Sequence, residues 1–152
     1  MMQLIEWRWR RLDEFDSRSL YQMLALRQRI FVIEQRCIYL DTDGLDGDTE
    51  HLTGHDGDHL ACCLRMMPPG LRGRAAAIGR VAVDRAYRGQ GLAREMMGLA
   101  LARIQQRHAP VPVRLAAQEH LGGFYASLGF EAVSQPYDED GIAHVDMLLE
   151  LD

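Results

Sequence analysis

The residues with the clearest chemical potential form a short turn, 88–93, which reads Arg-Gly-Gln-Gly-Leu-Ala. An apolar stretch precedes the turn and a helix-forming stretch follows it. The first N–H groups of a helix have no partner within the helix, and the helix dipole places about half a positive charge there. Gly89 and Gly91 would let a phosphate approach the backbone, and Arg88 and Arg94 could add charge-assisted contacts. The turn predicts an anion site, and a tight strand–helix connection without a ligand is the alternative.

Two common phosphate-binding motifs do not fit this turn. A dinucleotide-binding fingerprint needs a third small residue where this chain has Arg94. A nucleoside-triphosphate loop needs a lysine, and the sequence contains none. A phosphate-bearing cofactor of another kind remains.

The pattern of apolar residues predicts the elements that must position this turn. The expected order is β-α-β-β-β-α-β-α-β-β, which makes a mixed sheet flanked by helices. Helices are expected from Asp16 or Ser17 to about Glu34, from Leu92 onward, and around Tyr125 with Gly129 as the C-terminal cap. Strands are expected over 4–10, twice within 51–65 around a turn at 54–58, and over 75–83, 113–117, 130–134 and 144–151.

The motif Arg88-x-x-Gly91-x-Ala93, placed after an apolar strand, resembles the acyl-CoA pyrophosphate loop of the GNAT N-acetyltransferase superfamily. The expected order of elements is similar to that fold along nearly the whole chain. Further stretches resemble the ElaA-type branch of the superfamily, namely 26–35, 43–46, 51–52, 78–81, 117–118, 124–130 and 139–144.

This resemblance implies one N-acetyltransferase domain over residues 1–152 with an α/β (α+β) GNAT fold. The fold has a mixed, mostly antiparallel sheet of about six or seven strands flanked by helices, with a splayed central parallel pair. The implied activity is transfer of an acetyl or similar short acyl group from acetyl-CoA to a primary amine, by direct attack within a ternary complex. A non-catalytic acyl-CoA-binding regulatory module is the alternative.

The resemblance also assigns the cofactor side residue by residue. The central strand would pair its backbone with the pantetheine arm, the turn would bind the pyrophosphate, and the end of the next strand would line the gap for the thioester. The residues so implied are Val81, Ala82, Val83, Arg88, Gly89, Gln90, Gly91, Leu92, Ala93, Arg94, Ala117, Gln118 and Tyr125.

Acyl transfer to an amine needs a base for the ammonium proton, donors for the oxyanion and a proton for the departing thiolate. The resemblance places Tyr125 near the CoA sulfur as the general acid, and a core aromatic is the alternative interpretation. The central strand carries no glutamate at 75–77, so a base must come from elsewhere or act through water. The candidates for base or acceptor-site residue are Glu34, His51, Asp140 and His144. Glu34 could instead pair with an arginine, and His51 could bind a strand-end carbonyl.

The composition bounds the partners and the location. The formal net charge is −5, which argues against nucleic acid as a partner. No apolar run approaches the ~20 residues that span a bilayer, and residues 1–10 lack the apolar core of a signal peptide. We therefore expect a cytoplasmic protein whose partner is a small-molecule or peptide amine, with no membrane partner and with a homodimer possible.

The remaining polar and thiol residues favour no metal. Cys62 and Cys63 are adjacent in a strand and should point to opposite faces, and Cys37 is expected to have a packing role. The four acids Asp41, Asp43, Asp46 and Asp48 do not match a calcium loop. They either rim the acceptor site, where they would attract a cationic amine, or belong to a solvated loop.

Overall fold

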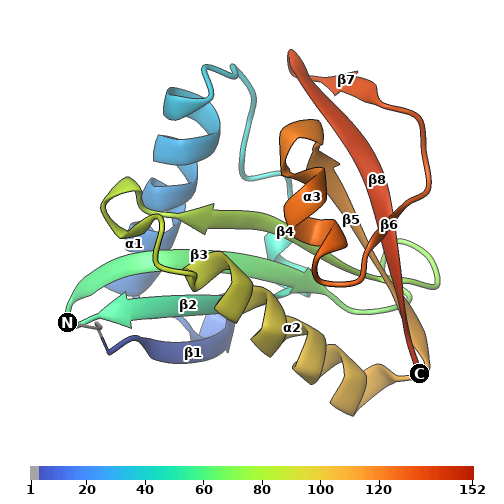
Figure 1. The fold of residues 1–152 in the computed structure, drawn as a ribbon. Helices are drawn as coiled ribbons and strands as arrows, with labels where there is room; N and C mark the ends of the chain where they lie inside the picture. The colour runs from blue at the N-terminus through green and yellow to red at the C-terminus, as the bar shows by residue number, and fades with distance from the viewer. Residues whose placement is uncertain (1–3) are drawn as a thin grey trace.

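The structure, a computed structural model, describes residues 4–152, so the first three residues of the charged N-terminal segment lie outside it. One eight-stranded sheet has the order β1-β2-β3-β4-β5-β8-β6, with β7 paired to β8 (Figure 1). This mixed, mostly antiparallel sheet with three α-helices confirms the expected fold class. The strands are β1 (Glu6–Arg11), β2 (Glu50–Asp56), β3 (His59–Met67), β4 (Ala76–Val83), β5 (Val111–Gln118), β6 (Glu131–Ala132), β7 (Tyr137–Glu139) and β8 (Ile142–Leu151).

Helices cover both faces of the sheet, and each face has its own apolar core. On one face α1 (Ser17–Arg27) packs on β3 and β4 through Met23 and Leu26, whereas α2 (Leu92–His108) and α3 (Gly122–Ala126) cover the other face. The side chains of Cys62 and Cys63 point to opposite faces of the sheet, as expected for neighbouring strand residues, because Cys62 belongs to the α2-side core and Cys63 to the α1-side core. None of the helices in residues 4–152 has the length and apolarity to cross a bilayer.

The central strands β4 and β5 diverge, as expected. They pair in parallel only at Ala76 with Val113 and Ala77 with Arg114. Beyond Ala77 the two strands separate, and β4 carries one extra residue opposite β3. This β-bulge includes Arg80, whose φ of 50° is rare for a residue other than glycine. The result is an unpaired strand edge facing a gap at the centre of the sheet.

The turn between β2 and β3 differs from the prediction of 54–58. Strand β2 continues through Gly54 to Asp56, and the chain reverses at 57–58. A side chain at Gly54 would lie 2.6 Å from Cys62 Sγ and 2.7 Å from the Trp7 ring. Gly54 is therefore needed for close packing within the sheet and not for a turn. Close approach of neighbouring groups is a common reason for glycine in a strand.

The predicted first helix, to about Glu34, is regular only to Arg27. It continues as a π-helical segment, η2 (Gln28–Glu34), in which the Gln35 N–H donates to the Ile30 carbonyl, five residues back. Strand β5 begins at Val111 rather than at 113, and β7 was not expected at all. β7 is only three residues long and forms solely by pairing with β8, so it has no periodic signal of its own.

Candidate active site

The turn that opens α2 has the geometry of an anion site. Gly91 is the N-cap residue, with a φ of 80°, and it offers no side-chain acceptor to the first helical N–H groups. Gly89 also has a positive φ, of 78°, and a β-carbon at either glycine would have no protein atom within 4 Å. Both glycines are thus explained by backbone conformation and by open space above the turn. The amides of Leu92, Ala93 and Arg94 are left for a ligand.

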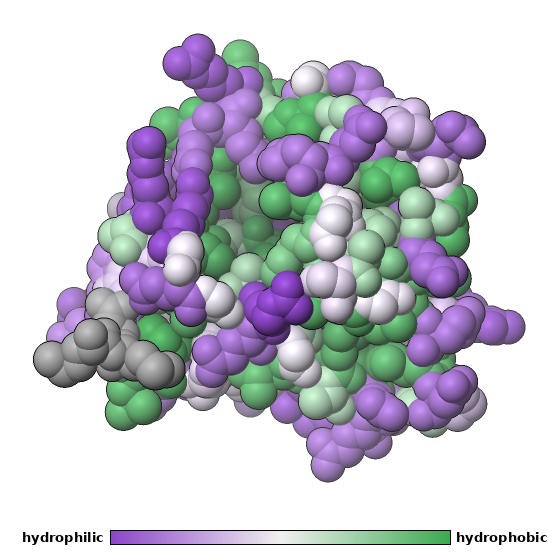
Figure 2. All heavy atoms as spheres, viewed as in Figure 1, coloured by the Kyte–Doolittle hydropathy of each residue, from purple (hydrophilic) through white to green (hydrophobic). Residues whose placement is uncertain are grey.

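A cleft of about 260 Å³ lies against this turn. Figure 2 shows the same face hollowed between the start of α2 and α3, with apolar surface inside the recess. Most of the predicted pyrophosphate turn lines the cleft, together with Phe124 from the third helix. The lining residues are Val83, Tyr87, Arg88, Gly89, Gly91, Leu92, Ala93, Arg94 and Phe124.

Arg88 in the turn and Arg94 in the first turn of α2 are both held by protein partners. Arg88 donates to both carboxylate oxygens of Glu34, with Nη2 2.9 Å from Oε2, and its Nε donates to the Val83 carbonyl at 3.1 Å. Arg94 donates to Ser127 Oγ at 2.8 Å and lies 5.3 Å from the centre of the Phe124 ring. Arg94 forms no ion pair with any residue from 4 to 152, so its charge is available to an anion in the cleft.

The pairing of Glu34 with Arg88 changes the interpretation of Glu34. The hydrogen bond from Arg88 holds the pKa of the Glu34 carboxyl below its usual range. A lowered pKa makes a carboxylate a weaker base. The structure therefore gives Glu34 the arginine partner that the sequence left open, and it ties η2 to the anion-binding turn.

The backbone of β4 faces the gap at alternate residues. The Asp84 N–H donates to the Ala61 carbonyl of β3 at 2.8 Å. Because N–H and C=O groups of neighbouring residues in a strand point in opposite directions, Ala82 also faces β3, whereas Val81 and Val83 face the gap. Of the three residues expected to meet the pantetheine arm, Val81 and Val83 are therefore placed to do so, and Ala82 is buried on the α1 side.

Tyr125 lies on α3, on the α2 side of the gap. Its side chain is 7% exposed and packs edge-to-face on Phe124 and Phe130. Burial raises the pKa of its phenol, so the hydroxyl stays protonated at neutral pH. None of the described residues hydrogen-bonds to this hydroxyl, which leaves it free to donate to a ligand.

His144 lies on β8, and its side chain is on the opposite face of the sheet from that of Val145, which belongs to the α2-side core. It pairs with Gln118 at the end of β5 and stacks on Tyr137 of β7. Its Nδ1 lies 2.8 Å from the Ile142 carbonyl oxygen. A carbonyl can only accept, so Nδ1 carries the proton and Nε2 of the neutral ring carries the lone pair. Nε2 lies 3.8 Å from Glu139 Oε2. Ala117, the other residue predicted to line the gap, has its side chain in the α2-side core.

The other two candidate bases lie elsewhere. His51 is on β2, two strands away from β4, and it is 1% exposed. Its Nε2 contacts Thr49 Oγ1 at 3.0 Å and the Asp46 carbonyl at 3.2 Å, which is the structural role that the sequence left open. Asp140 forms the turn between β7 and β8, and its carbonyl accepts from the Cys37 thiol at 3.3 Å. This contact joins the β7–β8 hairpin to the segment that follows η2.

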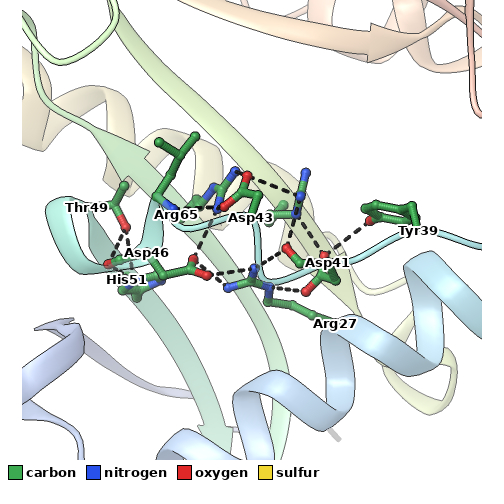
Figure 3. A network of polar contacts seen from close by, with 10 residues as sticks. Arg27, Tyr39, Asp41, Asp43, Asp46, Thr49, His51 and Arg65 are labelled. Carbon is green, nitrogen blue, oxygen red and sulfur yellow. Dashed lines mark hydrogen bonds and ion pairs between the residues drawn. The ribbon is translucent and has the colours of Figure 1, made fainter.

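The acidic loop is only partly the solvated loop of the second expectation. Asp48 is exposed, whereas Asp41 and Asp46 are buried. Asp41, Asp43 and Asp46 each pair with two arginines (Figure 3). These arginines, for which the sequence predicted no role, are Arg27, Arg65 and Arg80. One signal was present: Arg27 lies at helical spacing within the apolar stripe of α1, between Leu24 and Phe31. A charge in an apolar stripe predicts a buried partner.

The splayed parallel strand pair, the glycine turn and the open helix N-terminus are the features expected of the acetyltransferase fold. Residues 45–151 match the acetyltransferase (GNAT) domain model, and the chain belongs to the GNAT acetyltransferase family. It is 38% identical to the ElaA protein of Escherichia coli over 150 residues, which is 97% of this chain and 98% of that protein.

Two solved structures have the same fold over nearly their whole length. An acyl-CoA N-acyltransferase from Pseudomonas aeruginosa is similar with a TM-score of 0.91 and 38% identity, over 96% of this chain and 99% of that one. Escherichia coli ElaA itself matches with a TM-score of 0.90, over 97% of this chain and 100% of that one. These relatives confirm the resemblance to the ElaA-type branch.

Proposed function

We propose that this protein transfers an acetyl or similar short acyl group from acyl-CoA to a primary amine by direct attack within a ternary complex. The observation that carries the proposal is the gap between β4 and β5, which opens beside a helix N-terminus that has no side-chain cap. The amides of Leu92 to Arg94 and the charge of Arg94 would bind the pyrophosphate, and the free backbone of Val81 and Val83 would bind the pantetheine arm.

The two faces of the gap would then have different tasks. Tyr125 on the α3 side would donate a proton to the departing thiolate. His144 on the α1 side would accept the ammonium proton through Nε2, so the amine would enter from that side. Binding both substrates across one gap aligns the amine with the thioester, which supplies much of the acceleration in such reactions. The Val81 N–H, which faces the gap at the β4 bulge, would stabilise the oxyanion.

The test of the activity is release of free CoA from acetyl-CoA with a panel of amines, together with calorimetry of acetyl-CoA binding. Turnover of at least one amine is expected. Binding without turnover of any amine class would favour the regulatory module instead. Absence of binding would contradict both functions.

Replacing Tyr125 with phenylalanine is expected to lower kcat by about a hundredfold, the usual range for loss of a general acid. The melting temperature should barely change, because phenylalanine keeps the ring contacts and the hydroxyl has no partner in residues 4–152. Since the pKa of Tyr125 is raised, wild-type kcat should not fall with rising pH until above the ordinary phenol value of ~10. The exposed Tyr21→Phe is the control. Undiminished turnover in Tyr125→Phe would rule out this role.

Replacing His144 with asparagine is expected to lower kcat about tenfold to a hundredfold with little change in KM for acetyl-CoA. The asparagine amide can still donate to the Ile142 carbonyl, so the variant removes the lone pair of Nε2 and keeps the local bond. Steady-state kinetics measure the effect, and His108→Asn at the end of α2 is the control. A variant with wild-type kcat would show that the base lies elsewhere.

A further inference from the structure

Three arginines and three aspartates on the α1 face form a closed ring of ion pairs (Figure 3). Every arginine bridges two aspartates and every aspartate bridges two arginines, so the charges cancel within the ring. The nitrogen–oxygen distances are 2.8 Å for Arg27–Asp41, 2.8 Å for Arg27–Asp46, 3.1 Å for Arg65–Asp46, 2.6 Å for Arg65–Asp43, 3.4 Å for Arg80–Asp43 and 2.8 Å for Arg80–Asp41.

The ring joins parts of the chain that are far apart in sequence. Its arginines come from the end of α1, from β3 and from the bulge of β4, whereas all its aspartates come from the loop between η2 and β2. Arg27 and Asp41 have side chains only 1% and 2% exposed. The bond from Arg65 holds the pKa of Asp43 well below its usual range. Burial alone would lower the pKa of Arg27, but its bonds to Asp46 and the charge of Asp41 raise it.

Buried ion pairs are weak evidence of added stability, because removing charges from water costs about as much as their attraction returns. Their better-attested use is to specify one conformation. The feature that needs specifying here is the bulge at Arg80, where the backbone adopts a φ of 50°. The Arg80 side chain is tied to Asp41 and to Asp43, and its guanidinium lies 5.6 Å from the centre of the Tyr39 ring.

The bulge lies in the part of β4 beyond Ala77, where β4 no longer pairs with β5, and it includes Val81, whose backbone faces the gap. A shift of the bulge would turn the N–H of Val81 away from the thioester. We propose that the ring is a positioning device, which fixes the bulge through Arg80 and thereby aims the oxyanion-binding N–H of Val81. In this role Arg80, Asp41 and Asp43 are positioning residues, and the inference rests on the proposed acyl transfer.

The test compares two arginines of equal exposure. Arg80 and Arg103 each have a side chain that is 22% exposed and paired with a carboxylate, but Arg103 pairs with Glu50, away from the gap. Arg80→Met is expected to lower kcat about tenfold to a hundredfold and to change KM for acetyl-CoA less than threefold, because the phosphate turn is untouched. Arg103→Met should keep wild-type kcat. Arg80→Lys, which can reach only one of the two carboxylates, should give an intermediate kcat.

A second readout does not need an amine. The infrared band of the carbonyl in bound, ¹³C-labelled acetyl-CoA should shift to lower frequency in the wild type, because hydrogen bonds polarise the carbonyl. In Arg80→Met the shift should shrink while acetyl-CoA still binds. An unchanged shift, or an Arg80→Met kcat within twofold of wild type, would overturn the positioning role. Failure of the wild type to bind acetyl-CoA would instead contradict the proposed function, so the two failures are distinct.

Discussion

Replacing Gly91 with glutamate is expected to weaken acetyl-CoA binding at least about a hundredfold, which corresponds to about 2.7 kcal/mol. Two effects combine. The φ of 80° at Gly91 is unfavourable for any residue with a β-carbon. The added carboxylate would also occupy the open space above the turn, at the positive end of α2, where the pyrophosphate is proposed to bind. Calorimetric titration with acetyl-CoA measures the change.

The chain provides a matched control for this variant within the same helix. Gly98 is exposed, and a β-carbon there also has no protein atom within 4 Å. Gly98→Glu adds the same charge to α2 without a positive φ, so it should leave the affinity unchanged. Gly91→Ala separates the two effects, because it adds the backbone strain without the charge. If Gly91→Glu bound acetyl-CoA within about threefold of wild type, the turn would not be the pyrophosphate site.

Replacing Arg27 with methionine is expected to lower the free energy of unfolding by about 3–5 kcal/mol, the usual cost of breaking a buried ion pair from one side. The fully buried Asp41 would keep only Arg80, and Asp46 would keep only Arg65. For a chain of this length such a loss lowers the melting temperature by roughly 10 °C. Thermal and urea unfolding, followed by circular dichroism, measure the change.

Acid should reduce the difference between Arg27→Met and wild type. The pKa of Asp46 is lowered in the folded protein, because its bonds to Arg27 outweigh the effect of burial. A lowered carboxyl pKa contributes stability above the unfolded value of ~3.9, and this contribution is lost as pH falls through the native value. The difference between the two proteins should therefore be full at neutral pH and should shrink below about pH 4.

The control is Arg29→Met, the same change two residues further along the chain. The Arg29 side chain is 57% exposed and lies 3.8 Å from Asp84. Exposed pairs of this kind contribute about 0–1 kcal/mol. Equal melting temperatures for Arg27→Met and wild type would show that the ring does not hold the α1 face together.

Local signals in the sequence were enough to predict the central strand, the turn after it and the helix that follows. The apolar run predicted the strand at 75–83, the two glycines predicted the turn at 88–93, and the amphipathic stretch predicted α2. Each of these signals depends only on residues near in sequence, so the three segments were predicted close to their observed places. The separation of β4 from β5 was expected only through the family resemblance. The place of the bulge at Arg80 had no sequence signal, since a bulge depends on the register between two strands.

The candidate site divides in the same way. The sequence by itself predicted the turn at 88–93 with its two glycines, which the structure shows at positive φ. Tyr125 was proposed as the acid only through the family resemblance, and the sequence left the base open among four residues. Only the tertiary structure put Tyr125 and His144 on opposite faces of the sheet, paired Glu34 with Arg88, and placed His51 on β2, two strands from β4. The acidic loop shows the reason most clearly. Asp41 and Arg80 are 39 residues apart in sequence, and no local pattern states that a charge will meet its partner across the fold.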